Sequence, residues 1–257
     1  MNFNNRPEII FTDVDDTLTL NGELPVSTLV ALYRLRAANI LVIPVTGACA
    51  GWCDQIARLW PVSAVIGENG AFCIEKSKNG LKYIDTQSEQ QRQQNYQHLK
   101  RVANKVLSQN SSLGVAQDNA YRRYDLAIDY NQQCKGTTEY QLKLALDLIH
   151  SEGIRATASS IHINIWKGEH DKKHGALLWL DRHYPHWTLD RIKQKCAYIG
   201  DSLNDDAMFG FFNNTIAVAN IAPYLEKLQN RPNKVLSLPG GEGFAEWVDE
   251  ILSDSNN

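Results

Sequence analysis

The sequence predicts an α/β protein in which the two ends of the chain build a parallel-sheet core and the middle forms an inserted α+β unit. Residues 8–66 alternate short apolar strands with amphipathic helices, the pattern of a parallel sheet with crossover helices. The same alternation resumes after Gly168, whereas the intervening stretch is arranged as helix, strand, helix, strand, strand. We therefore expect a core from residues 1–84 and 170–257 and an inserted cap from residues 85–169.

Composition and charge narrow the classes of function. The chain has 257 residues, of which 43% are hydrophobic and 21% charged, as in soluble globular proteins. A net charge of −3 gives no support for binding nucleic acid, and five cysteines, an odd number, argue against a disulfide framework. No stretch approaches the roughly 18 apolar residues that cross a bilayer, and the first residues lack the apolar core of a signal peptide. We therefore expect a cytoplasmic protein without a membrane partner.

The first third of the chain supplies three strands and two helices. Residues 8–12 and 40–45 are compact apolar runs rich in β-branched side chains, which predict buried strands. In residues 25–38 apolar side chains recur at intervals of three and four, which predicts a helix with Ser27 or Thr28 as a cap. The remaining elements of this part are a helix and a strand, over residues 50–60 and 64–66.

The rest of the chain divides at Gly168. Before it, residues 86–109 are polar but carry apolar side chains along one side, which predicts a solvated helix, and residues 137–150 are clearly amphipathic. Strands are predicted where the pattern alternates, over residues 121–130, 154–160 and 161–166. After Gly168 we expect helices over residues 173–183, 205–212, 223–229 and 243–252, and strands over residues 196–200 and 215–219.

Two acidic clusters follow predicted strands from opposite ends of the chain. Asp13 and Asp15 come directly after residues 8–12, and Asp201 comes directly after residues 196–200. The carboxyl ends of parallel strands meet at one edge of a sheet, where α/β proteins bind ligands, and Mg2+ prefers carboxylate oxygens. Because Asp13 and Asp15 are two residues apart, alternation points both carboxylates the same way, which suits a nucleophile beside a proton carrier. A surface acidic turn is the alternative.

Four short motifs then resemble those of the haloacid dehalogenase superfamily of phosphotransferases, in that family's order. They are the run 13–18, Thr46 at the end of a strand, Lys173 in the segment 171–177, and the run 200–205. The long insert resembles the C2-type cap in its IIB form, which includes Cof-type sugar phosphatases and sucrose-phosphate phosphatase. The resemblance covers nearly the whole chain and implies a Rossmann-like core with a C2B-type cap.

The resemblance also implies a role for each motif residue. Asp13 would be the nucleophile that forms an aspartyl-phosphate, and Asp15 would protonate the leaving oxygen and then activate water. Thr46 would donate a hydrogen bond to the phosphoryl group, and Lys173 would offset the charge on Asp13. Like charges oppose attack by a carboxylate on a phosphoryl group, so a lysine and a cation are needed to neutralise the site.

The same resemblance implies a Mg2+ cofactor. The Asp13 carboxylate, the main-chain carbonyl of Asp15 and the Asp201 carboxylate would bind it. Asn204 and Asp205 would support the metal or the lysine from behind.

Two positions depart from the commonest pattern of the family, and the third motif offers two lysines. Many relatives have glycine where Asp16 stands, so this acid is either an exposed turn residue or a modifier of the metal site. Many carry arginine where this chain has Ala48, which removes one expected substrate contact. Lys172 competes with Lys173 for the third motif; we favour Lys173 because it stands three residues before Ala176.

The cap offers candidates for substrate binding. Alternation over residues 161–166 puts three isoleucines on one face and His162, Asn164 and Trp166 on the other, which could roof the site and bind a sugar, or simply face solvent. Arg123 is expected to bind a second anionic group or to form a surface ion pair.

Two core residues join these candidates. Gly47 follows the second motif and is assigned to substrate binding. Asn69 lies in a Glu68-Asn69-Gly70 stretch that resembles one near the entrance to the site in this family, and it either positions substrate or forms a turn.

The sequence therefore predicts a Mg2+-dependent phosphatase acting on a small phosphorylated metabolite, most simply a sugar phosphate. A sugar phosphomutase is the first alternative, although the cap strands offer few cationic residues to hold a bisphosphate. A non-catalytic binding protein on the same fold is the second, although all four motif residues are present. We expect a monomer or a homodimer.

Overall fold

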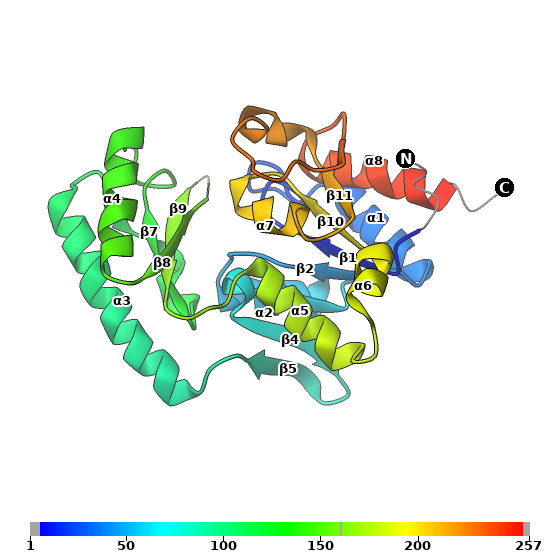
Figure 1. Cartoon of the computed structure of the whole chain (residues 1–257), viewed down its shortest axis with the longest axis horizontal. Helices are drawn as coiled ribbons and strands as arrows, with labels where there is room; N and C mark the ends of the chain where they lie inside the picture. The colour runs from blue at the N-terminus through cyan, green and yellow to red at the C-terminus, as the bar shows by residue number, and fades with distance from the viewer. Residues whose placement is uncertain (1–5, 160, 254–257) are drawn as a thin grey trace. The chain divides into compact units, whose positions relative to one another are not determined.

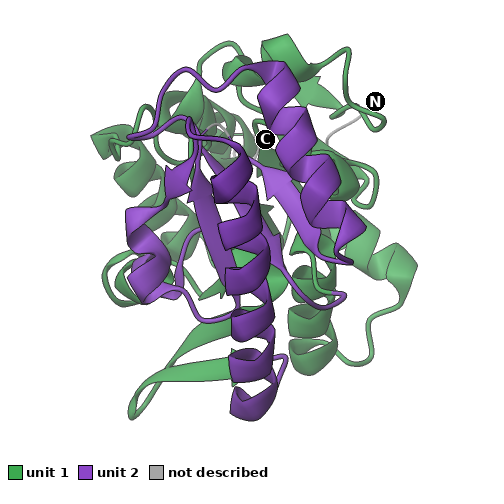
Figure 2. Ribbon diagram, turned by 90° about the vertical axis from the view of Figure 1, so that its left-hand side faces the viewer, with its two compact units in different colours: residues 1–46, 53–84, 170–257 green, residues 47–52, 85–169 purple. Residues whose placement is uncertain are grey.

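The structure is a computed structural model that describes residues 6–159 and 161–253. The chain divides into two compact units (Figure 2). Unit 1 takes residues 1–46, 53–84 and 170–257, and unit 2 takes residues 47–52 and 85–169. The segment 47–52, which the sequence analysis assigned to the core, thus groups by its contacts with the inserted unit.

Unit 1 is built around a five-stranded parallel sheet in the order β12-β11-β10-β1-β2 (Figure 1). In chain order the strands are β1 Ile9–Thr12, β2 Leu41–Pro44, β10 Cys196–Gly200, β11 Asn214–Ala217 and β12 Lys234–Val235. β1 lies between β10 and β2, and Thr12 is paired with Ile199. The predicted α/β class with a parallel-sheet core is confirmed, and the residues that follow β1 and β10 emerge side by side.

The third predicted strand runs parallel beside the end of β2, as expected, but it also begins a second sheet. β3 Ala64–Gly67 pairs antiparallel with β4 Phe72–Ser77 in a separate sheet that β5 Gly80–Asp85 completes. A single bridge between Val45 and Ile66 joins it to β2. The chain reverses between β3 and β4 through Asn69 and Gly70, whose φ angles are 56° and 97°. This reversal sends β4 back beside β3 instead of into another crossover helix.

Helices pack around the sheet of unit 1; α5 and α7 bury side chains in a core that includes Phe11 and Tyr198. Neither Ser27 nor Thr28 caps the first helix as predicted. The helix starts after Pro25, and the Thr28 hydroxyl donates to the Leu18 carbonyl. A 3-10 turn over Ala219–Tyr224 replaces the helix predicted at residues 223–229. The helices are α1 Val26–Ala37, α2 Ala50–Leu59, α5 Lys172–His183, α6 Leu189–Lys195, α7 Asp206–Phe209 and α8 Gly240–Ser253; residues 50–52 of α2 group with unit 2.

Unit 2 is an antiparallel sheet with two helices on one face (Figure 1). Its order is β6-β7-β9-β8. Ile163 and Ile165 pack with the apolar sides of both helices, as the alternation predicts. The strand predicted at residues 121–130 is shorter, because Gln117–Tyr121 forms a 3-10 turn. The elements are β6 Gly114–Val115, β7 Asp125–Asp129, β8 Arg155–Ala158, β9 His162–Trp166, α3 Glu89–Gln109 and α4 Glu139–Ser151.

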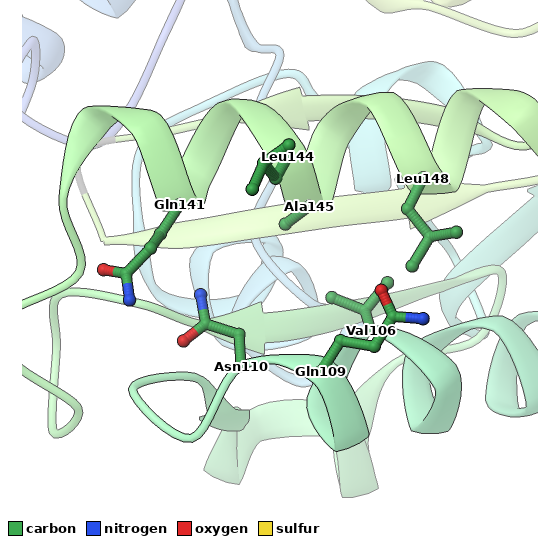
Figure 3. A pocket seen from close by; sticks show the side chains of 7 residues that line it. All are labelled: Val106, Gln109, Asn110, Gln141, Leu144, Ala145 and Leu148. Carbon is green, nitrogen blue, oxygen red and sulfur yellow. The ribbon is translucent and has the colours of Figure 1, made fainter.

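A small cavity of about 100 Å3 lies between α3 and α4 (Figure 3). Its lining is apolar apart from the side-chain amides of Gln109, Asn110 and Gln141. It contains no carboxylate, histidine or lysine, so it lacks the groups that chemistry on a phosphate ester requires. In the described part of the chain, no helix is both long and apolar enough to cross a membrane.

The loop that follows β7 is organised by one buried carboxylate. Asp129 accepts hydrogen bonds at 2.8–3.2 Å from the backbone N–H groups of Asn131, Gln132, Gln133 and Cys134. Burial opposes ionisation, but these N–H donors outweigh it and hold the pKa of Asp129 below its usual value.

We expect Asp129→Ala to lower the free energy of unfolding by about 2 kcal/mol, because four backbone donors lose their acceptor. The exposed Asp147→Ala serves as the control and should change it by less than about 0.5 kcal/mol. Denaturant unfolding measures both. Because the folded pKa is depressed, the contribution of Asp129 is present above its unfolded pKa and is lost as the pH falls through the folded value. A difference between the variants that persists at pH 2 would contradict this account.

Candidate active site

The two acidic segments meet at the carboxyl edge of the parallel sheet in unit 1. Asp13 follows β1 and Asp201 follows β10, and the parallel register brings the two strand ends together. Carboxylate oxygens of Asp13, Asp201 and Asp205 lie within 4.8 Å of one another, and all three residues are buried. Three buried carboxylates at one point require compensating positive charge.

Lys172 supplies part of that charge. Its Nζ lies 2.8 Å from Asp13 Oδ2 and 2.7 Å from Asp205 Oδ1, and it donates to Asn204 Oδ1 at 3.1 Å. The side chain is only 4% exposed. Burial alone would lower the pKa of Lys172, but the carboxylates of Asp13 and Asp205 outweigh it and hold the pKa above its usual value. Lys172 is therefore a charged lysine at the centre of the cluster.

The prediction of Lys173 as the third-motif lysine is wrong. The buried face of α5 is formed by Lys172, Gly175, Ala176, Trp179 and Leu180, at helical intervals of three and four. Lys173 stands about 100° further round the helix and is half-buried outside this face. The spacing argument took Ala176 as the small residue after the lysine. Gly175, three residues after Lys172, fills that place, and a Cβ there would lie 2.6 Å from Gly70 Cα.

Asp205 supports the cluster instead of offering a free ligand atom. Its Oδ1 accepts from Lys172 and from the Tyr198 hydroxyl, and its Oδ2 accepts from the backbone N–H groups of Asp201 and Ser202 at 2.9 and 3.1 Å. A side chain at Gly200 would collide with this carboxylate, because an added Cβ would lie 2.4 Å from Oδ2. The glycine before Asp201 therefore makes room for Asp205.

Asp201 is oriented by two residues that the sequence analysis did not assign to the site. Its Oδ1 accepts from the Thr17 hydroxyl at 3.0 Å, and its Oδ2 accepts from Asn220 Nδ2 at 3.2 Å. Asn220 also donates to the Asp16 carbonyl at 3.0 Å. Asn220 follows β11 at the same edge of the sheet, so its position after a predicted parallel strand was an available signal.

Asp15 and Asp16 occupy the turn that leaves the site. The Asp15 side chain is exposed, and its charge contributes to the raised pKa of Asp13. Asp16 has a φ of 55°, and its Oδ1 accepts from the Asn21 N–H at 3.0 Å. Of the two interpretations of Asp16, this geometry favours the turn residue, since aspartate tolerates the left-handed region and hydrogen-bonds locally.

The buried cluster carries an excess of negative charge. Burial, together with Asp205 and Asp15, raises the pKa of Asp13 to about 7 even though Lys172 opposes the shift. Burial, Asp205 and Asp13 raise the pKa of Asp201 to about 9. One lysine therefore does not balance the site. An all-oxygen donor set that lacks positive charge fits a hard divalent cation such as Mg2+.

A backbone hydrogen bond joins Thr46 and Asn69 in unit 1. Thr46 is buried at the end of the segment that follows β2; its N–H donates to the Ile66 carbonyl at 2.9 Å, and its carbonyl accepts from the Asn69 N–H at 3.0 Å. Asn69 is 4% exposed and left-handed, and among the described residues its Nδ2 has no hydrogen-bond partner. A buried unpaired amide donor is costly, which favours the ligand-binding interpretation of Asn69 over the turn alone.

The remaining candidates lie in unit 2. Arg123 forms an ion pair with Asp85 at 3.0 Å, which supports the surface-pair interpretation of this arginine. His162 is buried and lies 2.8 Å from Gln132 Oε1, and burial lowers its pKa. Asn164 donates to the Gly47 carbonyl at 3.3 Å. Their predicted role as the roof of a substrate site stays a prediction.

Comparison with known proteins agrees with this geometry. The family model of haloacid dehalogenase-like hydrolases matches residues 10–140. The chain is 28% identical over 251 residues to a phosphoglycolate phosphatase of Pyrobaculum neutrophilum, covering 96% of each chain.

Two solved structures are similar in fold. The sucrose-phosphatase of Synechocystis sp. PCC6803, in complex with sucrose and phosphate, superposes with a TM-score of 0.67 at 12% identity, covering 96% of this chain and 98% of that one. The subclass IIB sugar phosphatase BT4131 superposes with a TM-score of 0.63 at 14% identity, covering 95% and 98%.

The raised pKa values of the cluster lead to a pH-dependent stability. In the metal-free protein, Asp13 and Asp201 hold protons more tightly when folded than their ordinary pKa of 3.8 allows. The contribution of these two groups to the stability of the folded state is complete below their ordinary pKa of 3.8. It is lost as the pH rises through the folded pKa of Asp13, about 7, and then through that of Asp201, about 9. We expect the Tm without metal to fall between about pH 5 and pH 9, and the increase in Tm on adding Mg2+ to grow over that range.

Thermal unfolding with and without Mg2+ tests this, and Asp201→Asn provides the comparison. The variant should have a higher Tm than the wild type at about pH 8 without metal and should lose most of the shift with Mg2+. A Mg2+ shift that is the same at both ends of the pH range would contradict the charge argument.

Proposed function

Because this chain belongs to the haloacid dehalogenase-like hydrolase family, we propose that it is a Mg2+-dependent phosphatase that cleaves a small phosphomonoester through an aspartyl-phosphate. The observation that carries the proposal is the position of Asp13. It lies at the carboxyl end of β1, ion-paired to Lys172 and within reach of Asp201. A buried carboxylate held by a lysine beside other carboxylates is the arrangement that attack on a phosphoryl group needs.

In the proposed reaction, Asp13 attacks the phosphorus while the bond from phosphorus to the ester oxygen breaks. Asp15 gives its proton to that oxygen, which leaves as the alcohol. Asp15 then takes a proton from a water molecule, whose oxygen attacks the phosphorus and releases Asp13 with inorganic phosphate. Asp15 suits this exchange because its side chain is exposed two residues from the nucleophile.

Lys172 and the Val14 N–H favour the ionised form of the nucleophile and fix its orientation. Lys172 and the Val14 N–H each hold one oxygen of Asp13, at 2.8 Å in both cases. Thr46, at the neighbouring strand end, would donate to the phosphoryl group. The Asp13 and Asp201 carboxylates and the Asp15 carbonyl would hold Mg2+, which supplies the positive charge that Lys172 alone does not.

We propose a phosphorylated sugar as the substrate class, with Gly47, Asn69, Arg123, His162 and Asn164 as binding candidates. Sugar phosphatases of similar fold support it. Phosphoglycolate is the second candidate, because the relative that is 28% identical carries that name. A phosphomutase is disfavoured, since Arg122, Arg123 and Arg155 already face carboxylates in unit 2, and a bisphosphate would need cations that are not neutralised.

We expect Asp13→Asn to lower kcat at least about 1000-fold, because the amide is not a nucleophile. Asp16→Asn is the matched control and should keep kcat within about twofold, since asparagine also tolerates the left-handed turn. Phosphate release with Mg2+ measures both, across sugar phosphates, phosphoglycolate and a small aryl phosphate. EDTA should stop the reaction and added Mg2+ should restore it. Full activity of Asp13→Asn would remove the proposed mechanism.

The two neighbouring lysines give a second test. Lys172→Met should lower kcat by at least about 100-fold, because two buried carboxylates lose their counter-charge, whereas Lys173→Met should change it by less than about twofold. Circular dichroism establishes that both variants are folded. The assignment fails if the two substitutions reduce turnover equally.

A further inference from the structure

The turn that follows the proposed nucleophile is closed by the Thr19 hydroxyl. This hydroxyl accepts from the Asp16 N–H at 3.1 Å and donates to the Val14 carbonyl at 3.2 Å. The Val14 carbonyl also accepts from the backbone N–H groups of Thr17, Leu18 and Thr19, at 3.3, 2.9 and 3.0 Å. The hydroxyl is thus both an acceptor and a donor inside one turn, and the whole turn belongs to unit 1.

The bond from the Asp16 N–H also sets the direction of the Asp15 carbonyl. That N–H and that carbonyl belong to one peptide group, and this group is trans, as are the other peptide groups of the described residues. A trans peptide is planar, and its carbonyl points opposite to its N–H. The Asp15 carbonyl therefore points away from the Thr19 hydroxyl, and its direction depends on that hydroxyl.

The next peptide group of the turn is held by Asn220. The Asn220 Nδ2 donates to the Asp16 carbonyl at 3.0 Å and to Asp201 Oδ2 at 3.2 Å. Between the two peptide groups Asp16 has a φ of 55°, a conformation that aspartate tolerates better than most residues. Both peptide groups that flank Asp16 are therefore hydrogen-bonded, and the second is joined through Asn220 to a carboxylate of the buried cluster.

Thr19 is itself held in place by the start of α8. Gly240, the first residue of that helix, lies against the Thr19 carbonyl, because an added Cβ would be 2.5 Å from the carbonyl oxygen. The Gly240 N–H donates to Asn220 Oδ1 at 3.0 Å. One glycine of unit 1 therefore contacts both Thr19 and Asn220, the two residues that hold the peptide groups of the turn.

We propose that Thr19 is a positioning residue for Mg2+: by accepting from the Asp16 N–H, its hydroxyl fixes the direction of the Asp15 carbonyl that would bind the metal. This inference rests on the proposed phosphatase function and deepens it. A main-chain carbonyl has no side chain of its own to orient it, so its direction depends on what its peptide group bonds. Residues that orient metal ligands from outside typically change metal affinity 10-fold to 100-fold.

The experiment measures Mg2+ binding to the metal-free, substrate-free protein by isothermal titration calorimetry. Thr19→Val keeps the shape of the side chain but removes the hydroxyl, and we expect it to raise the Kd for Mg2+ by about tenfold. Thr19→Ser keeps the hydroxyl and should stay within about twofold of wild type. Thr19→Ala removes the hydroxyl without adding bulk and should match Thr19→Val, which keeps the test open if valine hinders folding.

Thr215 in β11 offers a matched control within unit 1. Its hydroxyl also accepts from a backbone N–H and donates to an oxygen: it accepts from the Asn233 N–H at 3.0 Å and donates to Asn233 Oδ1 at 2.7 Å. Thr215→Val therefore removes the same two kinds of hydrogen bond outside the turn. It should lower the Tm of the metal-free protein and leave the Kd for Mg2+ within about twofold of wild type, which separates a loss of stability from a loss of metal binding.

Two results would overturn the inference and leave the proposed function standing. One is unchanged Mg2+ affinity in the folded Thr19→Val and Thr19→Ala variants. The other is an equal loss in Thr19→Val and Thr19→Ser, because the hydroxyl would then not be the group that matters. If the wild-type protein neither bound Mg2+ nor released phosphate, the proposed function would fail and the inference with it. A loss in Thr19→Val that serine avoids, with Thr215→Val unaffected, supports the inference.

Discussion

The structure of unit 1 depends on one electrostatic constraint: three buried carboxylates share a small volume with a single lysine. Carboxylates in such a position are stable only when hydrogen bonds and positive charge replace the water they have lost. Asp205 meets the requirement through four donors, and Lys172 binds both Asp205 and Asp13. Among the described residues, the side chain of Asp201 accepts from two neutral donors, Thr17 and Asn220, and its pKa is raised more strongly than that of Asp13. The site is thus neutral only when protons or a cation are bound.

The fold satisfies this constraint by using the parallel sheet to gather groups from distant parts of the chain. β1 and β10 deliver Asp13 and Asp201 side by side, β11 leads to Asn220, and α5 begins with Lys172. Close packing then leaves space only for glycine at two points. Gly200 makes room for Asp205, and Gly175 lets α5 approach the turn at Gly70. The close backbone approach at these two glycines therefore holds the charged side chains in fixed positions.

The sequence predicted the elements whose residue pattern is imposed by burial along a short stretch of the chain. The apolar runs of β1, β2 and β10 identified the parallel core, and the alternation of β9 identified its isoleucine face, because burial imposes both patterns. The antiparallel pairing of β3 with β4 was missed, because a four-residue apolar run does not reveal a second neighbour and the left-handed turn after β3 creates it. The lysine was misassigned because motif spacing does not specify helical phase. The ion pairs of Arg122 were not predicted, because its partners Asp118 and Asp125 are known only from the fold.

The charged side chains of the two units differ in what they are able to bind. In the proposed reaction the carboxylates and Lys172 of unit 1 would act on any phosphomonoester, since they would contact only the phosphoryl group. In unit 2 the arginines that might attract a second anion are neutralised: Arg122 by Asp118 and Asp125, and Arg123 by Asp85. His162 is buried with a lowered pKa, which favours the neutral imidazole near pH 7. Hydrogen-bonding groups without net positive charge suit the hydroxyls of a sugar better than the carboxylate of phosphoglycolate. On this argument, a sugar phosphate stays the first proposed substrate, even though the relative of higher identity is named for the acid.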